Sequence, residues 1–378
     1  MFILFHGRFP GEKAASLFAA KDAEAFAAQG IQVQVVIPRR RNVDPNTAFD
    51  YYNVHRNFDI VVLPIIDFFS WKIPSKLSFY LNFLAFSLAC RSYLKKESTK
   101  DDIIYSNESL PLYFASALNR KTFYEMHDFP ESKFWLFKMF LKSCTWILIH
   151  NRWKVEKFRQ TFPGIKAHIV CEPNAVQIEE FDIPLSKEEA RKQLNLPNDK
   201  KIAVYTGHLF GWKGVETLAQ AARFLDNDFL VVFVGGTDND VAQFKQKHGT
   251  VTNVSIVGHK PHKEIPVWQK ASDVLVLPNT AKEAISAYYT SPMKLFEYMA
   301  SGRPIVASDI PSIREIVDEN SAVLVKADEP KLLAEGIVKA AGDQILVNNL
   351  VTEAFEKVRI HTWAMRAQRI IAFMNKSN

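Results

Sequence analysis

The stretch from Ser291 to Ser308 holds the side chains best suited to bind a charged ligand. Lys294 and Glu297 are three residues apart, so on a helix they lie about one turn apart and can face the same ligand. Ser291-Pro292 is typical of a helix start, with a capping hydroxyl followed by a proline that needs no amide hydrogen. A lysine and a carboxylate there suit a phosphate beside a sugar hydroxyl. The alternative is a surface ion pair on an amphipathic helix.

The glycine-bearing loop 207–214 is a second candidate anion site. Gly207, Gly211 and Gly214 let the backbone approach a ligand closely, and the loop leads into a predicted helix. Lys213 adds a positive charge that suits a diphosphate. The order of residues matches neither a Walker loop nor the dinucleotide fingerprint. The alternative is a tight strand-to-helix turn with a solvated lysine.

Other polar residues carry weaker signals. His6 lies on the loop after the first predicted strand and could face a cleft or be structural. The run 238–240 resembles a short acidic metal motif, but we interpret it as a solvated loop. The residues that could line a ligand cleft are His6, Gly7 and Gly11 in the first half and Glu283, Tyr289 and Thr290 in the second.

Strands and helices alternate in the first half of the chain, which predicts a parallel sheet covered on both faces, a doubly wound Rossmann-like domain. We expect a helix over 13–29, and buried strands over 3–5, 33–37, 60–64, 103–106, 122–125 and 147–150. Ligands of such sheets bind beyond the carboxyl ends of the strands. That places loops 6–13, 107–109 and 126–130 on the ligand-binding edge.

The second half repeats this alternation and predicts a second Rossmann-like domain. We expect a helix over 215–224 and strands over 202–206, 229–234, 254–257, 274–277 and 304–307, with Gly302 ending the helix before the last of these. The boundary falls near 176–182, which gives domains 1–176 and 177–360. A final helix from 361, within the segment 361–378, is expected to cross back onto the first domain.

The length and composition of the chain limit the classes of protein to which it can belong. The chain has 378 residues, enough for two domains, and its 48% hydrophobic and 23% charged residues are ordinary for a globular protein. Cys90, Cys144 and Cys171 form no metal cluster or disulfide framework, which favours a reducing compartment. The first residues read as a strand rather than a signal peptide, and no stretch reaches the roughly 18 to 20 apolar residues of a membrane span.

Two stretches combine aromatic and basic residues. One is 68–74, leading into a predicted helix over 76–96, and the other is 133–146. Aromatic rings beside lysines suit a helix that lies in a membrane interface. Ordinary packing helices with snorkelling lysines are the alternative. The net charge of +6 could favour anionic lipid or phosphorylated substrates.

Taken together, the motifs of the second half occur in a characteristic order: loop 207–214, Gly235-Gly236, Gly258, the strand 274–277 and the stretch from Lys294 to Ser308. This order resembles the donor-binding domain of the GT-B glycosyltransferases, specifically the retaining enzymes of glycosyltransferase family 4. Residues 173–176, Pro-Asn-Ala-Val, are similar to that family's Pro-Asn-Gly-Val hinge, with alanine in place of glycine. The resemblance covers most of residues 170–330.

The resemblance implies roles for individual residues. Lys213 would contact the diphosphate of a nucleotide sugar, Glu297 would bind the ribose hydroxyls, and His127 would face the transferred sugar, so these are the candidate catalytic residues. Lys294 would add a phosphate or ribose contact. The other implied donor-binding positions are Gly207, His208, Gly235, Ser291 and Leu295. GT-B enzymes need no bound metal, so we expect no metal and no cofactor beyond the donor substrate.

Two positions depart from the family pattern. Tyr289 stands eight residues before Glu297, where the family has an acid that contacts the donor sugar, and Glu283 is a candidate substitute. His208 stands where many relatives have an arginine beside the lysine of the loop, and an imidazole binds phosphate less strongly.

The sequence therefore predicts a retaining transferase that moves a sugar from a nucleoside-diphosphate donor to a hydroxyl of a glycan, a lipid-linked or a small-molecule acceptor. A role in cell-envelope glycan or glycolipid synthesis follows, in the cytoplasm and in peripheral contact with the anionic inner face of the cell membrane. No nucleic-acid partner is expected. The alternatives are a GT-B nucleotide-sugar epimerase and a non-catalytic GT-B partner subunit.

Overall fold

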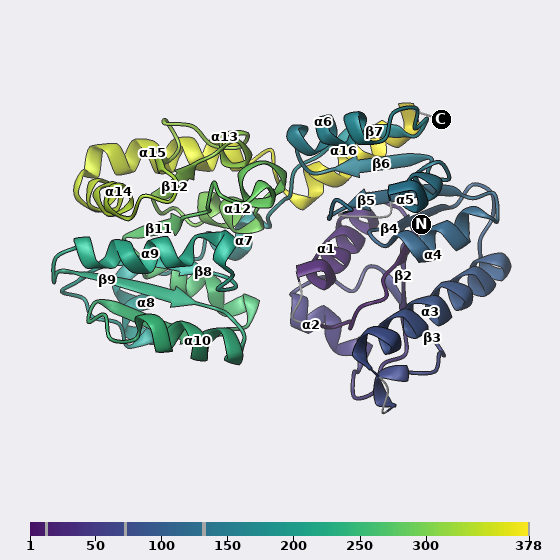
Figure 1. Cartoon of the computed structure of the whole chain (residues 1–378), viewed down its shortest axis with the longest axis horizontal. Coiled ribbons are helices and arrows are strands. Elements are labelled where there is room, and N and C mark those ends of the chain that lie inside the picture. Colours follow the sequence, from purple (N-terminus) through teal and green to yellow (C-terminus); the bar gives the residue numbers. More distant parts are fainter. Residues whose placement is uncertain (12–13, 72–73, 131–133, 377–378) are drawn as a thin grey trace. The chain divides into compact units, whose positions relative to one another are not determined.

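The computed structural model describes residues 1–11, 14–71, 74–130 and 134–376 (Figure 1). Predictions that include residues 12–13, 72–73, 133 or 377–378 lie, at those positions, outside the described residues. The chain folds as two compact units. Unit 1 comprises Met1–Glu172 together with the segment from Trp363 onward, and unit 2 comprises Pro173–Thr362. The C-terminal helix is therefore part of unit 1.

Unit 1 is built on a parallel seven-stranded sheet in the order β3-β2-β1-β4-β5-β6-β7. Its strands are β1 (Phe2–Leu4), β2 (Gln34–Pro38), β3 (Asp59–Leu63), β4 (Ile103–Ser106), β5 (Lys121–Met126), β6 (Trp146–Ile149) and β7 (His168–Cys171). Its helices are α1 (Ala14–Ala28), α2 (Ala48–Tyr52), α3 (Ser75–Glu97), α4 (Ser109–Ser116), α5 (Phe134–Leu141), α6 (Arg152–Thr161) and α16 (Trp363–Lys376), with short 3-10 turns at Pro45–Thr47 and Phe68–Ser70.

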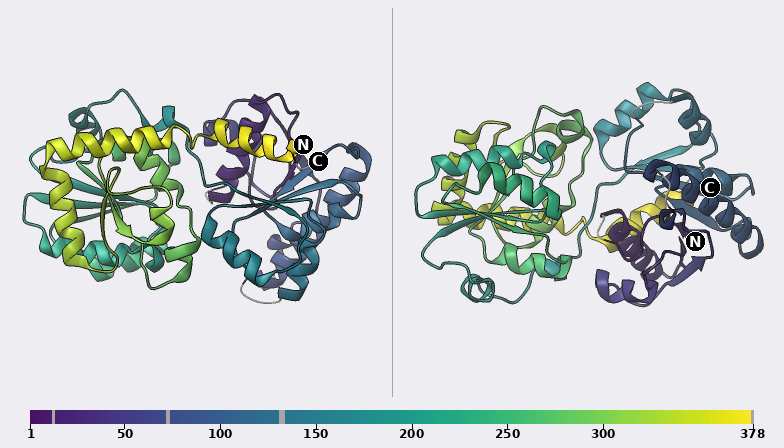
Figure 2. Two further views of the ribbon diagram at one scale, coloured as in Figure 1. Left: turned by 90° about the horizontal axis from the view of Figure 1, so that it is seen from above. Right: turned by 60° about the horizontal axis from the view of Figure 1, so that its bottom comes forward.

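The helices of unit 1 pack on the sheet through buried apolar side chains. Phe86 of α3, Leu112 of α4, Leu141 of α5 and Phe158 of α6 belong to one core cluster, so these four helices share one core with the sheet. Helix α16, at the end of the chain, packs against α1, near its beginning (Figure 2). Among the described residues, none of the helices combines the length and the apolar character that crossing a membrane requires.

Unit 2 is built on a parallel six-stranded sheet in the order β10-β9-β8-β11-β12-β13. Its strands are β8 (Lys201–Thr206), β9 (Phe229–Val234), β10 (Val254–Gly258), β11 (Val274–Leu277), β12 (Ile305–Asp309) and β13 (Val323–Lys326). Its helices are α7 (Ile178–Phe181), α8 (Lys187–Leu194), α9 (Val215–Ala221), α10 (Asp238–His248), α11 (Ile265–Lys270), α12 (Met293–Ala300), α13 (Pro311–Arg314), α14 (Pro330–Gly342) and α15 (Gln344–Val358). Single turns lie at Gly211–Lys213, Ala222–Phe224 and His262–Glu264, and a π-helix at Ile285–Tyr289.

Strand β8 shows why both faces of this sheet are covered. Ile202 and Val204 contribute to one core cluster, whereas Ala203 and Tyr205 contribute to another. Successive residues of a strand point to opposite faces, so both faces must be apolar and both must be covered by helices. The predicted pair of doubly wound Rossmann-like sheets is confirmed.

Several predicted elements need correction. Residues 238–240 are the first turn of α10 rather than a loop, because Thr237 and Asp240 form a capping box. The helix expected over 215–224 ends at Ala221 and continues as a 3-10 turn. The C-terminal helix begins at Trp363, so His361 lies in unit 2. Strands β7 and β13 were not predicted.

Candidate functional site

The carboxyl edge of the unit 2 sheet brings two glycine turns into contact. Gly207 follows β8 with φ +120°, and Gly235 follows β9 with φ +126°. The Gly207 amide donates to the Val234 carbonyl at 2.8 Å, and a Cβ built on Gly235 would lie 2.4 Å from the Gly207 oxygen. Only glycine fits such a close approach of two backbones at positive φ. These turns form the floor of the site.

The loop after Gly207 lies against the end of β11. Gly214 has φ +72°, and a Cβ on it would lie 1.6 Å from the Pro278 carbonyl oxygen. The loop forms a 3-10 turn over Gly211–Lys213 and then enters α9. Contact with β11 therefore fixes the start of α9 and the position of Lys213.

The Lys294 ammonium is buried beside these turns. Its Nζ lies 3.8 Å from the centre of the Tyr205 ring, and a Cβ on Gly207 would come within 2.7 Å of it. Among the described residues this Nζ has no hydrogen-bond partner. Burial and the charge of Lys213 hold the pKa of Lys294 well below its usual value, and Glu297 acts in the opposite direction. A buried amine without an acceptor is costly, so this group suits an anionic ligand.

Lys213, on the loop that follows β8, lies close enough to Lys294 and Glu297 to interact with their charges. Its Nζ lies 5.1 Å from the Trp212 ring centre and 5.8 Å from that of Phe210. Burial lowers the pKa of Lys213 to about 8, while the Glu297 carboxylate acts to raise it. Lys213, Lys294 and Glu297 therefore form one electrostatic cluster, with two amines and one carboxylate.

Glu297 has a partner that the sequence did not suggest. His262 Nε2 lies 3.3 Å from Glu297 Oε1. His262 begins the turn after β10, so its place just beyond a strand end was the signal that could have pointed to it. The Glu297 side chain is 12% exposed, which leaves part of the carboxylate accessible.

Three predicted donor-binding residues have structural contacts. Ser291 does not cap α12. Its hydroxyl accepts from the Asn174 amide at 3.1 Å and its carbonyl accepts from Asn174 Nδ2 at 2.5 Å, so it ties the start of unit 2 to this helix. Leu295 is fully buried in the core. His208 stacks on Phe210 at 4.9 Å, and burial and Lys213 lower its pKa, so it adds little positive charge at neutral pH.

Tyr289, which stands where the related family has an acid, lies in an unusual element, a π-helix. Tyr289 and Thr290 are half-buried at the end of the π-helix Ile285–Tyr289. Glu283 is exposed just before that helix, and its carbonyl accepts from the Ser286 and Ala287 amides. A π-helical turn is frequent at functional sites.

In unit 1, the predicted cleft loop is largely internal. His6 is buried and lies 2.8 Å from Arg40, measured from its Nε2 to Arg40 Nη2. Burial, then Arg40, lowers the pKa of His6 to about 3, so His6 is neutral and structural. Gly7 packs on the Phe5 ring, and the Gly11 amide donates to the Tyr52 hydroxyl at 2.6 Å.

His127 lies just after β5 in a network that sequence reasoning missed. Its Nε2 is 3.3 Å from Glu125 Oε1, and the same oxygen is 2.7 Å from His150 Nε2 and 2.6 Å from Arg366 Nη2. One ligand atom each from Glu125, His127 and His150 lie within 4.8 Å, a spacing that could hold a metal. A guanidinium on the shared oxygen opposes a cation there, so we interpret the cluster as a hydrogen-bond network.

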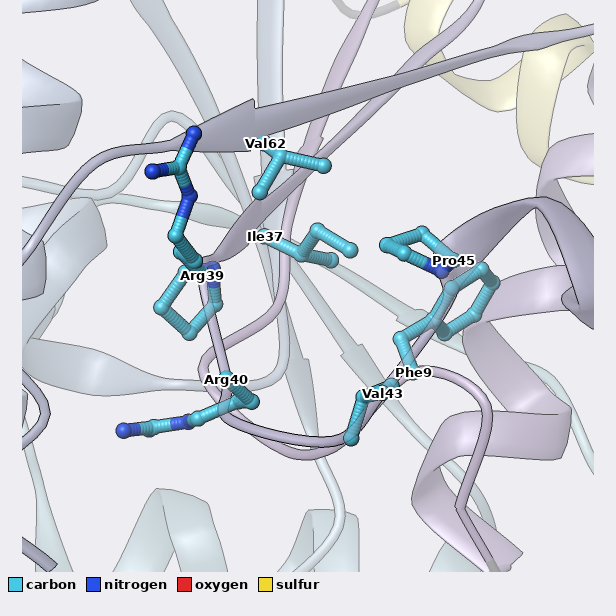
Figure 3. Close-up of a pocket in the computed structure, with 8 residues that line it drawn as sticks. Phe9, Ile37, Arg39, Arg40, Val43, Pro45 and Val62 are labelled. Carbon is cyan, nitrogen blue, oxygen red and sulfur yellow. The ribbon is translucent and has the colours of Figure 1, made fainter. Parts of the chain in front are cut away.

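A cavity of about 260 Å³ opens at the carboxyl ends of β2 and β3 (Figure 3). Figure 3 shows the apolar side chains of Phe9, Ile37, Pro45 and Val62 gathered together, with the side chains of the two arginines to one side. The cavity is lined by Phe9, Ile37, Pro38, Arg39, Arg40, Val43, Pro45 and Val62. It lies at the sheet edge where such domains bind ligands.

Comparison with known proteins finds a family match within unit 2 and relatives that are glycosyltransferases. Residues 186–357 match the family described as glycosyl transferases group 1. TuaC of Bacillus subtilis, named a putative teichuronic acid biosynthesis glycosyltransferase, is 22% identical over 369 residues, 93% of this chain and 90% of that protein. D-inositol 3-phosphate glycosyltransferase of Corynebacterium diphtheriae is 25% identical over 197 residues, 48% of this chain and 44% of the relative.

Solved structures match both units. Sucrose-phosphate synthase of Thermosynechococcus elongatus has a TM-score of 0.79 at 19% identity, over 99% of this chain and 98% of that one. HepE of Anabaena, in complex with UDP and glucose, has a TM-score of 0.75 at 17% identity, over the full length of both chains. The chain has the fold of the GT-B glycosyltransferases, and residues 186–357 are similar to the group 1 family; the protein is a glycosyltransferase.

The predicted fold and transferase class of this glycosyltransferase are thereby confirmed. The family match covers the part of unit 2 that contains Lys213, Lys294 and Glu297. Unit 1, with His127 and its network, lies outside that match.

Proposed function

We propose that this glycosyltransferase binds the diphosphate of a nucleotide sugar at Lys213 and Lys294, and moves the sugar, with retention, to an acceptor hydroxyl. The observation that carries the proposal is the buried Lys294 ammonium, which has no hydrogen-bond acceptor among the described residues. A diphosphate would supply the missing acceptors and the charge that two neighbouring amines require. HepE of Anabaena has been solved with UDP and with UDP-glucose, which supports this class of donor.

The mechanism follows from where charge develops. As the sugar leaves, negative charge grows on the diphosphate, and preorganised lysines stabilise it more than they stabilise the ground state. Glu297 would accept hydrogen bonds from both hydroxyls of the ribose, held in place by His262. His127 would contact the transferred sugar. Because Tyr289 replaces the usual acid, we expect sugar contacts from backbone groups and hydroxyls, or from Glu283.

The proposed acceptor is a glycan, lipid-linked or small molecule used in cell-envelope synthesis. The names of TuaC, a putative teichuronic acid biosynthesis glycosyltransferase, and of WaaG, which is involved in lipopolysaccharide biosynthesis, support this context. The cavity beside Arg39 in unit 1 is a candidate for part of the acceptor site. No metal or cofactor is required in this scheme.

Calorimetric titration of UDP, GDP and ADP tests the donor site. We expect wild-type protein to bind one of them, with an affinity that falls as pH rises through about 8, because Lys213 then loses the proton that the diphosphate needs. Glu297→Ala is expected to weaken binding about 10- to 100-fold, since it removes charged hydrogen bonds to the ribose.

Glu283→Ala is the matched control, because this exposed carboxylate is not expected to contact the nucleotide. Its nucleotide affinity should stay at the wild-type value, while slower turnover of the nucleotide sugar would indicate that Glu283 replaces the missing acid. Absence of binding by every nucleoside diphosphate would contradict the proposal. Conversion of the donor to an isomer without an acceptor would instead indicate an epimerase.

We also propose peripheral contact with an anionic membrane through α3 and α5 of unit 1. Both helices expose large apolar side chains, which helices that only pack in a core would bury. The exposed large apolar side chains are Leu77, Phe79, Tyr80, Leu84 and Leu88 on α3, and Phe134, Trp135, Leu136 and Met139 on α5. Lys76 and Lys142 are also exposed nearby in sequence. Apolar rings with flanking lysines suit a lipid interface.

Vesicle flotation tests this contact. We expect wild-type protein to float with phosphatidylglycerol vesicles and to float less with phosphatidylcholine alone. Tyr80→Ser with Trp135→Ser should abolish flotation, because these side chains are 65% and 70% exposed. Ile345→Ser, at an apolar residue of unit 2 that is 77% exposed, is the control and should float like wild type. Wild-type protein that stays in the soluble fraction would refute the contact.

A further inference from the structure

The C-terminal helix contributes a buried arginine to the interior of unit 1. Arg366 of α16 is 1% exposed, and its two terminal nitrogens contact different carboxyl groups. Nη1 lies 2.6 Å from Asp22 Oδ1 on α1, and Nη2 lies 2.6 Å from Glu125 Oε1 on β5. A segment 241 residues away in the sequence thus reaches the carboxylate that contacts His127.

Both oxygens of the Glu125 carboxylate have close polar partners. Oε1 lies near Arg366, His150 and His127, and Oε2 accepts from the Tyr105 hydroxyl. Burial acts to raise the pKa of Glu125, but Arg366 and the two imidazoles hold it well below its usual value, so Glu125 is ionised. Burial raises the pKa of Asp22 well above its usual value and lowers that of His150 to about 3. His150 is therefore neutral, and Arg366 balances Glu125.

Of the side chains of His127, His150 and Glu125, that of His127 is the most exposed to solvent. Its side chain is 22% exposed, against 6% for His150 and 1% for Glu125. The Phe18 ring packs against it at 4.9 Å, and Lys154 Nζ donates to its carbonyl at 2.8 Å. The imidazole is thus held on several sides while one part stays accessible to a ligand.

We propose that Arg366 is a positioning residue for His127: by fixing the ionised Glu125 carboxylate, it holds the His127 ring with its proton on Nε2 and its lone pair on Nδ1. The inference rests on the proposed function in assigning His127 to the transferred sugar. A carboxylate can only accept, so the nitrogen facing it carries the proton and the other nitrogen becomes the acceptor. Such outer partners set the tautomer and orientation of a functional imidazole.

Arg366 also supplies the positive charge that faces the Glu125 carboxylate. The titratable groups around His127 come from several elements: Glu125 on β5 and Asp128 just after it, His150 after β6, Lys154 on α6, Asp22 on α1 and Arg366 on α16. Removal of Arg366 leaves Glu125 without its balancing cation.

Nuclear magnetic resonance of 15N-histidine-labelled protein measures the tautomer of the His127 ring directly, and it requires no enzymatic turnover. The His127 signals are assigned by comparison with His127→Gln. In wild type we expect the ring proton on Nε2. In Arg366→Met we expect mixed tautomers, because the Glu125 carboxylate is no longer held in place. Arg366→Lys, which keeps the charge, should change the tautomers less. With donor and acceptor, Arg366→Met should lower kcat about 10- to 100-fold and leave KM for the donor nearly unchanged.

Arg369→Met is the matched control. Arg369 lies on the same helix and pairs with Glu172, with its Nε 3.0 Å from both carboxylate oxygens, so it ties α16 to unit 1 without touching Glu125 or His127. Its loss should lower stability but leave the His127 tautomer as in wild type. An unchanged His127 in Arg366→Met, or the same change in Arg369→Met, would overturn the proposal. A protein that binds no nucleoside diphosphate but shows the expected tautomers would refute the proposed function alone.

Discussion

Replacement of Lys294 by methionine is expected to weaken nucleotide binding strongly and, at the same time, to stabilise the free protein. The Lys294 ammonium is buried, lacks a hydrogen-bond acceptor among the described residues, and has a pKa held well below its usual value by burial and by Lys213. Methionine keeps an unbranched side chain, one atom shorter than that of lysine, and removes the buried polar group. We expect a gain of about 1–3 kcal/mol in the free energy of unfolding, measured by urea denaturation without ligand.

The loss of binding should be about 100-fold for the nucleoside diphosphate that wild type binds, because a charged hydrogen bond to phosphate disappears. Lys213→Met is the companion variant. Lys213 is only partly buried, so its replacement should weaken binding with a smaller change in stability. If Lys294→Met lowered the free energy of unfolding and bound nucleotide like wild type, Lys294 would be a structural residue.

Replacement of Gly214 by alanine is expected to cost at least about 3 kcal/mol of stability and to remove nucleotide binding. A Cβ there would lie 1.6 Å from the Pro278 carbonyl oxygen and 2.5 Å from its carbonyl carbon, at φ +72°. These are backbone atoms at the end of β11, so no side-chain rotation can relieve the clash. The loop must move away, and Lys213 moves with it. Urea denaturation and titration with nucleoside diphosphate measure the two effects.

Gly302→Ala separates the clash from the backbone conformation. Gly302 has nearly the same φ, +69°, but a Cβ on it would meet nothing within 4 Å. Its replacement should cost only the left-handed conformation, about 1–2 kcal/mol, and leave binding unchanged. Equal losses in the two variants would show that the approach of Gly214 to β11 is not what stabilises the loop.

The positions of most strands could be read from the sequence alone. Strands β9 and β11 begin and end where their apolar runs do, because a strand of a parallel sheet is buried on both faces. Strand β7 (His168–Cys171) was missed because its residues are only partly buried or exposed at the sheet edge. The start of α10 was missed because a capping box within a polar run looks like a loop.

The sequence by itself also indicated the electrostatic cluster of Lys213, Lys294 and Glu297. Lys294 and Glu297 share one helix, and Lys213 follows a glycine loop, so local spacing and turn chemistry place each of them at the edge of a sheet. Their burial, and with it the lowered pKa values, depends on Tyr205 and on the contact of Gly207 with Gly235, which no local pattern contains.

Only the tertiary structure decided the surroundings of His127. Glu125 lies two residues before it and could be seen in the sequence, but His150 and Arg366 come from elements far along the chain. Hydrophobic periodicity finds faces and strand ends, whereas the partner of a buried charge depends on which helix packs beside which strand. In the sequence, Arg366 looks like an ordinary basic residue of an amphipathic helix. In the structure, α16 packs against α1 and places Arg366 between Asp22 and Glu125.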